Sequence, residues 1–304
     1  TTIEENGRIS SPGHAKKGEI STRAILYREF ETPFLPKEKI SKLVRYHGLP
    51  IWVFDKINSQ KAIIESSLVC NNFLLSLLAK ADMLGRICLD QDDMLYRIEL
   101  FKEYALEQNC FSESKKFSDS FSKFSYFEKE EISPDYPIHN DTSCKVTIMS
   151  GLPGTGKDYF IDHNLPGLPV VSIDKIRLKY KIDPNDKYAT GFAIQMAKEE
   201  ARTYLRKKQD FVWNGMNITK QIRQQVVGLC REYNAYVTIK YLEVPYQTLL
   251  TQNKNREHVV KESVLERFIN KLEVPSLTEA HEVEYFESSK KQTLNNYEYA
   301  EKSN

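Results

Sequence analysis

The stretch TIMSGLPGTGKDYFI, residues 147–161, constrains the fold more than any other part of the sequence. An apolar run typical of a buried strand leads into a glycine-rich turn, and a helix is predicted to begin at Lys157. This order matches the G-x-x-x-x-G-K pattern of a phosphate-binding loop, which lies between a strand and a helix. The stretch therefore predicts an α/β domain with an anion site at this turn.

The residue types in the turn suit that role. Gly151, Gly154 and Gly156 allow the backbone to fold its N–H groups around an anion, and Thr155 lies among them in the expected nucleotide-binding set. Lys157 adds a point charge at the outer phosphates. The alternative is an ordinary glycine-rich turn, which the strand, loop, lysine and helix in register disfavour.

Asp158 follows the lysine at the position where a hydroxyl normally contacts Mg²⁺. A carboxylate is also a suitable ligand, because Mg²⁺ prefers oxygen donors. The other interpretation is a helix cap, since the helix dipole favours an acidic residue in the first turn. Both interpretations stay open from the sequence.

Strand-like and helix-like segments alternate from residue 143 to residue 290. The strand-like segments are KVTIM, PVVSI, DFVWN and AYVTIKYLEV, and the amphipathic ones are GFAIQMAKEEARTYLRKK and TKQIRQQVVGLCREY. Such alternation predicts a parallel sheet with helices on both faces. Residues 291–304 are polar and are expected to form a tail.

Three charged residues are candidates for the same edge of this sheet. Asp174 comes at the carboxyl end of a predicted strand, where open α/β sheets bind ligands, and Arg177 follows one helical turn later. An aspartate there can accept a hydroxyl proton, and an arginine can clamp a phosphate. Arg256 lies in a basic helical hairpin, residues 252–275, that suits a lid over phosphates. A cap and solvated surface charges are the alternatives.

The first part of the chain follows a different pattern. Residues 1–109 have apolar side chains at three- and four-residue intervals, which predicts an all-α domain, and residues 110–142 are expected to connect the two domains. The 43 basic and 42 acidic side chains nearly cancel, so composition neither supports nor excludes nucleic acid as a partner. Five scattered cysteines suit a reducing, cytoplasmic compartment, and no apolar run approaches the roughly 18 residues that a membrane span needs.

Four segments occur in an order and spacing that resembles the kinase module of bacterial two-domain RNA end-healing proteins. They are SGLPGTGKD, SIDKIR, FVWNGMNITKQIR and residues 249–286. In that family an HD-type phosphohydrolase is fused to a P-loop polynucleotide 5′-hydroxyl kinase, and the resemblance covers nearly the whole chain. It implies ATP and Mg²⁺ as cofactors and nucleic acid 5′-OH ends, RNA or DNA, as partners.

The resemblance also implies roles for individual residues. Lys157 would stabilise the transferring phosphoryl group, Asp174 would be the general base, Arg177 would engage the phosphate of the acceptor, and Arg256 would be the lid arginine. Two positions depart from the family pattern. Tyr159 stands where the family usually has threonine, and Met216 replaces a threonine expected before an asparagine.

HD phosphohydrolases bind metal through ligands in the order H…HD…H…H…D. In this chain His14, His47 and Asp82 match the last three positions, and the sequence has no HD dipeptide. We therefore expect an incomplete HD-like domain, with the three side chains in one partly exposed cleft, weak or no metal binding and no phosphatase activity. A complete domain would hold a transition metal. Because the chain begins at Thr1, we also expect it to be a piece of a longer protein.

Other functions remain open at this point. A small-molecule P-loop kinase would share the loop and lid but would need a closed acceptor pocket. A non-catalytic nucleotide-binding module would fit Asp158 and Tyr159. A mechanical AAA-type ATPase would need a strand ending in an Asp-Glu pair, which DFVWNGMN does not provide. A homodimer is among the assemblies that the sequence leaves open.

Overall fold

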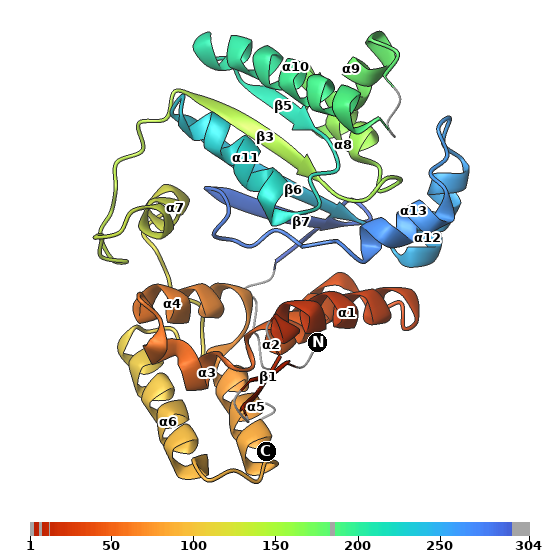
Figure 1. The fold of residues 1–304 in the computed structure, drawn as a ribbon. Helices are drawn as coiled ribbons and strands as arrows, with labels where there is room; N and C mark the ends of the chain where they lie inside the picture. The colour runs from red at the N-terminus through yellow and green to blue at the C-terminus, as the bar shows by residue number, and fades with distance from the viewer. Residues whose placement is uncertain (1–2, 6–7, 12, 183–185, 294–304) are drawn as a thin grey trace, which may run out of the picture. The chain divides into compact units, whose positions relative to one another are not determined.

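The computed structural model describes residues 3–5, 8–11, 13–182 and 186–293 (Figure 1). The chain divides into two compact units. The first contains the described residues up to Lys116 together with Thr293, and the second spans Phe117–Gln292. The predicted tail, 291–304, lies outside the described residues except for its first three positions.

The first unit is mainly helical, as its apolar spacing predicts. It also contains an antiparallel strand pair, β1–β2, so the expectation of an all-α domain was wrong at this point. The elements are β1 (Ile3–Glu5), β2 (Arg8–Ser10), α1 (His14–Arg28), α2 (Phe34–Tyr46), α3 (Leu49–Trp52), the 3-10 helix η1 (Val53–Asp55), α4 (Ser59–Val69), α5 (Asn72–Leu84) and α6 (Gln91–Glu107).

A cap separates α4 from α5 within a continuous apolar pattern. Cys70 is extended, and the side chain of Asn71 accepts a hydrogen bond from the backbone N–H of Leu74 at 3.1 Å. This cap satisfies one of the free N–H groups at the start of α5. In the part of the chain that the structure describes, no single helix is long and apolar enough to cross a membrane. The pair α4 and α5 passes that test on length and composition alone, with a bend of 104° between them.

A buried ion pair joins α1 to α2. The guanidinium of Arg23 donates to both carboxylate oxygens of Glu38, at 2.7 and 2.8 Å, and to Glu19 at 2.8 Å. Lys42 donates to the same Glu19 carboxylate at 2.7 Å. Burial alone would raise the pKa of Glu19, but the adjacent Lys42 and Arg23 outweigh it and lower the pKa to about 2.

The second unit is an α/β domain built on a six-stranded sheet. Its elements are α7 (Ser120–Glu128), β3 (Cys144–Ser150), α8 (Lys157–Asn164), β4 (Val170–Ser172), α9 (Ile173–Lys179), α10 (Lys187–Arg206), β5 (Phe211–Asn214), α11 (Lys220–Arg231), β6 (Ala235–Glu243), α12 (Tyr246–Lys254), α13 (Glu262–Ile269), β7 (Glu282–Glu287) and β8 (Lys290–Gln292).

The strand order is β4-β5-β3-β6-β7-β8. The first five strands pair in parallel, but β8 pairs antiparallel to β7. The sheet is therefore mixed, and the expectation of a purely parallel sheet was wrong at one edge. The reason is that β8 follows β7 through a short turn in which Ser288 and Ser289 both have positive φ, so the chain reverses without a crossover helix.

Apolar side chains pack on both faces of the sheet. On one face, Phe160 and Ile161 of α8 pack against Met149, Val212 and Leu242. Helix α11 lies against β6 on the face turned toward the viewer in Figure 1. Parallel strands need this double cover, because both faces of the sheet are apolar. The carboxyl ends of β3, β4, β5 and β6 consequently point to one edge.

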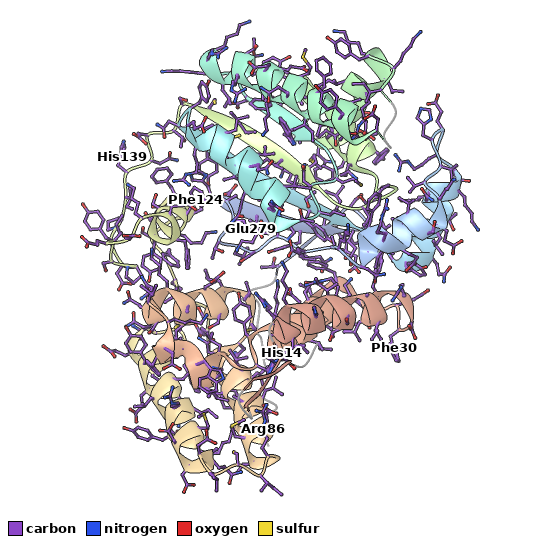
Figure 2. The ribbon with its side chains drawn as sticks, viewed as in Figure 1. His14, Phe30, Arg86, Phe124, His139 and Glu279 are labelled. Atoms are coloured by element: carbon purple, nitrogen blue, oxygen red, sulfur yellow. The ribbon has the colours of Figure 1, made fainter. Side chains whose placement is uncertain are left out.

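The predicted connector contains helix α7, and the boundary between the two units falls before it, between Lys116 and Phe117. Phe124 of α7 (labelled in Figure 2) packs against the ring of His281 at 4.3 Å between centroids, and Tyr236 of β6 stacks on the same ring at 4.6 Å. His281 accepts a hydrogen bond from the N–H of Val237 at 3.0 Å. Aromatic side chains thus hold α7 to the sheet.

A second buried ion pair lies below the glycine-rich turn. The guanidinium of Arg223 on α11 pairs with Glu279 (labelled in Figure 2) at 2.7 and 2.9 Å. Its Nη1 also donates to the carbonyls of Asn217 and Glu273, at 3.0 and 2.7 Å. Both side chains are buried, so the pair is stable only while each charge keeps its partners.

We expect Arg223→Met to lower the free energy of unfolding by about 3–5 kcal/mol, because it leaves the Glu279 carboxylate buried without a counter-charge. The measurement is urea unfolding. Arg202→Met breaks the more exposed pair with Glu199 and is the control, with an expected loss below about 1 kcal/mol. Equal losses in the two variants would contradict the role assigned to Arg223.

Candidate phosphate-binding site

The turn between β3 and α8 has the backbone of an anion-binding loop. Gly151, Gly154 and Gly156 have φ values of +148°, +89° and +81°, which side-chain-bearing residues rarely adopt. A Cβ atom on Gly151 would also lie 2.5 Å from the carbonyl oxygen of Leu242. The turn therefore requires glycine at these positions for reasons of conformation and, at Gly151, of space.

Lys157 is held across this loop by backbone carbonyls. Its Nζ donates to the oxygens of Gly151 and Leu152, at 2.9 and 2.8 Å. The pKa of Lys157 is lowered to about 8, mainly because the side chain is buried; the charge of Arg256 also lowers it, whereas Asp158 and Asp174 act in the opposite direction. These charges come from different elements, so the structure brings the predicted residues of the loop, α9 and the lid to one place.

Asp158 is an exposed residue in the first turn of α8. Its Oδ1 accepts a hydrogen bond from Nδ2 of Asn214 at 2.6 Å. Asn214 is the last residue of β5 and was not among the predicted site residues. A carboxylate oriented by an amide in this way can bind Mg²⁺ directly or through water.

Asp174 and Arg177 lie on α9, which begins directly after β4. The side chain of Ser172 caps this helix by accepting from the N–H of Lys175 at 3.3 Å. Arg177 Nη1 donates to Asp174 Oδ1 at 3.0 Å, and the Asp174 side chain is 73% exposed. The ion pair keeps the carboxylate in a defined position while leaving it open to a substrate.

Two guanidinium atoms at this site have no hydrogen-bond partner among the described residues. They are Nε of Arg177 and Nη1 of Arg256, and both atoms are buried. A buried donor without a partner costs free energy, so such groups are commonly satisfied by a ligand. Oxygen atoms of a phosphate match the donors that both arginines present.

The base of the predicted lid packs on the glycine-rich turn. Asn253 at the end of α12 donates to the carbonyl of Val260 at 2.8 Å and accepts from its N–H at 3.2 Å, which closes the loop that carries Arg256. The backbone N–H of Asn253 lies within 3.4 Å of the position that a Cβ on Gly154 would take. The lid loop is thus anchored against the turn itself.

The two departures from the family pattern have separate explanations. The backbone carbonyl of Met216 accepts a hydrogen bond from the N–H of Gly151 at 2.9 Å, so this contact does not depend on the side chain. Asn217, at a φ of +45°, donates to the carbonyl of Met149 at 2.7 Å. Tyr159 is 62% exposed and stacks on His163 of its own helix at 3.8 Å between centroids.

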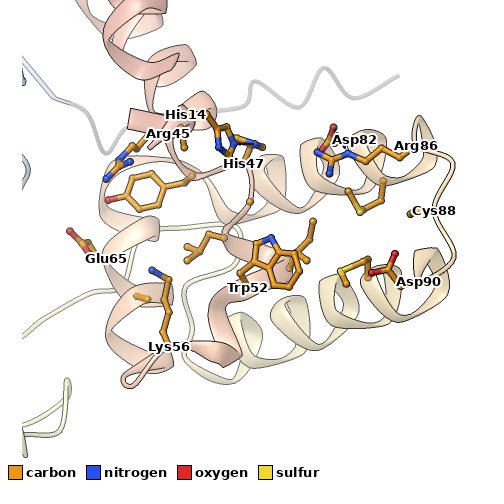
Figure 3. Close-up of a pocket in the computed structure, with 18 residues that line it drawn as sticks. His14, Arg45, His47, Trp52, Lys56, Glu65, Asp82, Arg86, Cys88 and Asp90 are labelled. Atoms are coloured by element: carbon orange, nitrogen blue, oxygen red, sulfur yellow. Dashed lines mark hydrogen bonds and ion pairs between the residues drawn. The ribbon is translucent and has the colours of Figure 1, made fainter. Parts of the chain in front are cut away.

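In the first unit, His14, His47 and Asp82 line one pocket of about 470 Å³ (Figure 3). The Nε2 atoms of the two histidines face each other at 3.3 Å. Each Nδ1 contacts a backbone carbonyl at 2.8 Å, that of Ser11 for His14 and that of Val44 for His47. If the Nδ1 atoms carry the protons, both Nε2 lone pairs point to the space between the rings, as in metal-binding imidazoles.

Asp82 does not complete this arrangement. Its carboxylate forms an ion pair with Arg86, which lies just beyond the end of α5. No group of three or more His, Cys, Asp and Glu side chains among the described residues is arranged to hold a metal ion. The two imidazoles therefore fit a metal, whereas the carboxylate does not in its present pairing.

We expect Asp158→Asn to raise the Mg²⁺ concentration needed for ATP binding more than it changes the affinity at saturating Mg²⁺, because the amide is a weaker ligand than the carboxylate. Calorimetric titration over a Mg²⁺ series measures both quantities. Asp162→Asn, an exposed position on the same helix, is the control. An unchanged Mg²⁺ dependence would leave Asp158 with a capping role alone.

We expect the first unit to bind Co²⁺ weakly, and His47→Ala to remove that binding while His139→Ala in the second unit does not. Arg86→Ala should strengthen it, because the change frees the Asp82 carboxylate to act as a third ligand. Visible absorption of Co²⁺ reports both effects. Equal binding in the wild type and the His47 variant would place the metal elsewhere.

Residues 146–275 match a family model described as an AAA domain. Comparison with curated protein sequences gives no match. The match and the loop geometry together place this half of the chain among α/β P-loop domains.

Three solved structures show local similarity. A candidate kinase from Chloroflexus aurantiacus is 16% identical, with a TM-score of 0.41 over 49% of this chain and 87% of that chain. A chain of the Pnkp1/Rnl/Hen1 complex is 21% identical, with a TM-score of 0.35 over 42% of this chain and 43% of that chain. A sugar kinase from Janibacter sp. is 18% identical, with a TM-score of 0.36 over 48% of this chain and 85% of that chain.

Proposed function

We propose that the second unit transfers the γ-phosphate of ATP to the 5′-hydroxyl end of a nucleic acid. The observation that supports the proposal is the lysine of the glycine-rich turn, which has Arg256 and an exposed carboxylate within electrostatic range, the carboxylate being paired with a second arginine. Lys157, Arg177 and Arg256 are the cations, and Asp174 is the carboxylate. Phosphoryl transfer needs this combination, because catalysis depends mainly on positioning and on stabilising phosphate charge.

The donor side of the reaction uses the loop and its lysine. The backbone N–H groups of the turn would hold the β- and γ-phosphates, and Lys157 Nζ, held by two carbonyls, would lie beside them. Mg²⁺ would neutralise phosphate charge, and Asp158, oriented by Asn214, would be its candidate protein ligand. Arg256 would contact the γ-phosphate from the lid.

The acceptor side uses α9. The oxygen of the acceptor hydroxyl attacks the γ-phosphorus, the bond to the β–γ bridging oxygen breaks, ADP leaves, and Asp174 takes the hydroxyl proton. Arg177 would hold the carboxylate through its Nη1 while its unpaired Nε contacts a phosphate of the acceptor.

The exposure of Asp174 favours a polymer end over a small alcohol. A small substrate needs a pocket that encloses it and excludes water. A polymer can instead bind through contacts to the nucleotides that follow its reacting end. The Asp174 side chain is 73% exposed. A motor of the AAA type is disfavoured by the end of β5, where Asn214 and Gly215 stand in place of an acidic pair.

The HD-like nature of the first unit is also a proposal. It is supported by the facing imidazoles of His14 and His47 and by the presence of Asp82 in the same pocket. The pairing of Asp82 with Arg86 leaves two free ligands, so we expect no metal-dependent phosphatase activity from this chain. A phosphomonoester assay with added Co²⁺ or Mn²⁺ would detect such activity.

The test of the kinase proposal is transfer of labelled γ-phosphate from ATP to a single-stranded 5′-OH oligonucleotide, compared with small alcohols. We expect Lys157→Ala to abolish transfer, because it removes charge stabilisation from the transition state. Asp174→Asn should lower kcat by about 10²-fold or more with little change in ATP affinity. Arg177→Ala should mainly raise KM for the oligonucleotide.

Lys207→Ala, at an exposed position after α10, is the control and should leave transfer unchanged. Phosphorylation of the small alcohols in preference to the oligonucleotide would replace the proposed acceptor. Near-wild-type transfer by the Lys157 variant would show that the loop is not catalytic.

A further inference from the structure

We propose that the surface formed by α9 and the first turns of α10 binds the single-stranded 5′-terminal segment of the acceptor. We call this surface the α9–α10 face and define it by Lys175, Lys179, Tyr180, Lys181 and Phe192. The inference rests on the proposed function for the identity of the acceptor. It goes further by assigning the residues that hold the strand and the form of strand that they accept.

The charge of the α9–α10 face matches a nucleic acid backbone. Residues 173–181 carry four cations and one carboxylate, in a chain whose charges otherwise nearly cancel. Arg177 pairs with Asp174, whereas Lys175, Lys179 and Lys181 are exposed and form no ion pair with the residues that the structure describes. Lys175 and Lys179 are four residues apart, so they lie on the same side of the helix.

Exposed aromatic side chains lie among these lysines. Tyr180 is 43% exposed and meets Phe192 of α10, itself 48% exposed, at 5.8 Å between centroids and 90° between ring planes. Tyr188, one turn before Phe192 on α10, is 92% exposed. Large aromatic rings are usually buried, so a group of exposed rings marks an interaction site. Lysines that track a backbone and rings that stack on bases are the two features of single-strand binding surfaces.

The α9–α10 face lies close to the proposed acceptor site. Asp174 is in the first turn of α9, and Tyr180 directly follows the last residue of this helix, about 9 Å farther along the axis. Figure 1 shows α10 alongside α9 at this edge of the unit. A strand whose 5′-hydroxyl lies at Asp174 would therefore have its following nucleotides within reach of the lysines and rings.

The lysines would attract an acidic peptide as well as a nucleic acid. The aromatic rings favour the nucleic acid, because they can stack on its bases. Stacking needs the flat face of an unpaired base, so a single strand should bind more tightly than a blunt duplex of the same length. We would measure binding by fluorescence anisotropy of a 3′-labelled 5′-OH oligonucleotide over a salt series, with the duplex and an acidic peptide as competitors.

Two variants test the two features separately. The triple change Lys175→Ala, Lys179→Ala and Lys181→Ala should weaken binding more than tenfold and reduce the slope of log affinity against log salt by about 2. The double change Tyr180→Ala and Phe192→Ala should weaken binding about tenfold with an unchanged slope. Tyr180→Phe should bind like the wild type, because stacking uses the ring and not the hydroxyl.

The control is a triple change at exposed lysines elsewhere, Lys116→Ala, Lys145→Ala and Lys207→Ala. Thermal unfolding of each variant checks that the fold is intact. Equal binding by the α9 triple variant and the control would overturn the inference. So would a duplex or acidic peptide that competes as well as the single strand.

The outcome also separates this inference from the proposed function. If the wild type phosphorylates the oligonucleotide but both α9–α10 variants bind it normally, the kinase proposal is supported and the binding role of the α9–α10 face is refuted. If the oligonucleotide binds as predicted but receives no phosphate, the binding role of the α9–α10 face is supported and the kinase proposal is refuted.

Discussion

The glycine-rich turn depends on a buried polar network that lies beneath it. Arg223 holds the carbonyl of Asn217, and Asn217 in turn holds the carbonyl of Met149 at the end of β3. Glu279 fixes the same guanidinium from the segment before β7. Three stretches of backbone that are distant in sequence are thereby fixed around one arginine. The site is therefore preformed, and binding of an anion would cost little conformational entropy.

The cations around this turn include one repelled by a neighbouring charge and two with unpaired donor atoms among the described residues. Burial and the charge of Arg256 both lower the pKa of Lys157, and Arg177 and Arg256 each keep a buried donor atom without a partner among the described residues. Such an arrangement lowers the stability of the fold, as groups that serve function often do. An anion would relieve all three groups together, so bound nucleotide should stabilise the fold as well as occupy the site.

The sequence predicted the parts of the fold that depend on local patterns. Strands β3 to β6 are short apolar runs, and the glycine spacing identified the turn. Strand β7 was not predicted, although glutamates alternate with apolar residues at its start, a pattern typical of a half-buried strand. Asn214 could not be assigned to the site, because its contact with Asp158 joins the end of β5 to the first turn of α8, two segments that only the fold brings together. The unpaired atoms of Arg177 and Arg256 likewise depend on packing that no local pattern encodes.

Met216 illustrates a general feature of sites built from backbone atoms. The hydrogen bond from Gly151 ends on its carbonyl, which every amino acid possesses. The side chain of Met216 can therefore be replaced during evolution without loss of the contact. The next residue, Asn217, can be replaced less freely, because its φ of +45° disfavours most side chains. Sequence patterns that score side-chain identity will record divergence here, and related chains can be missed although the loop is held in the same way.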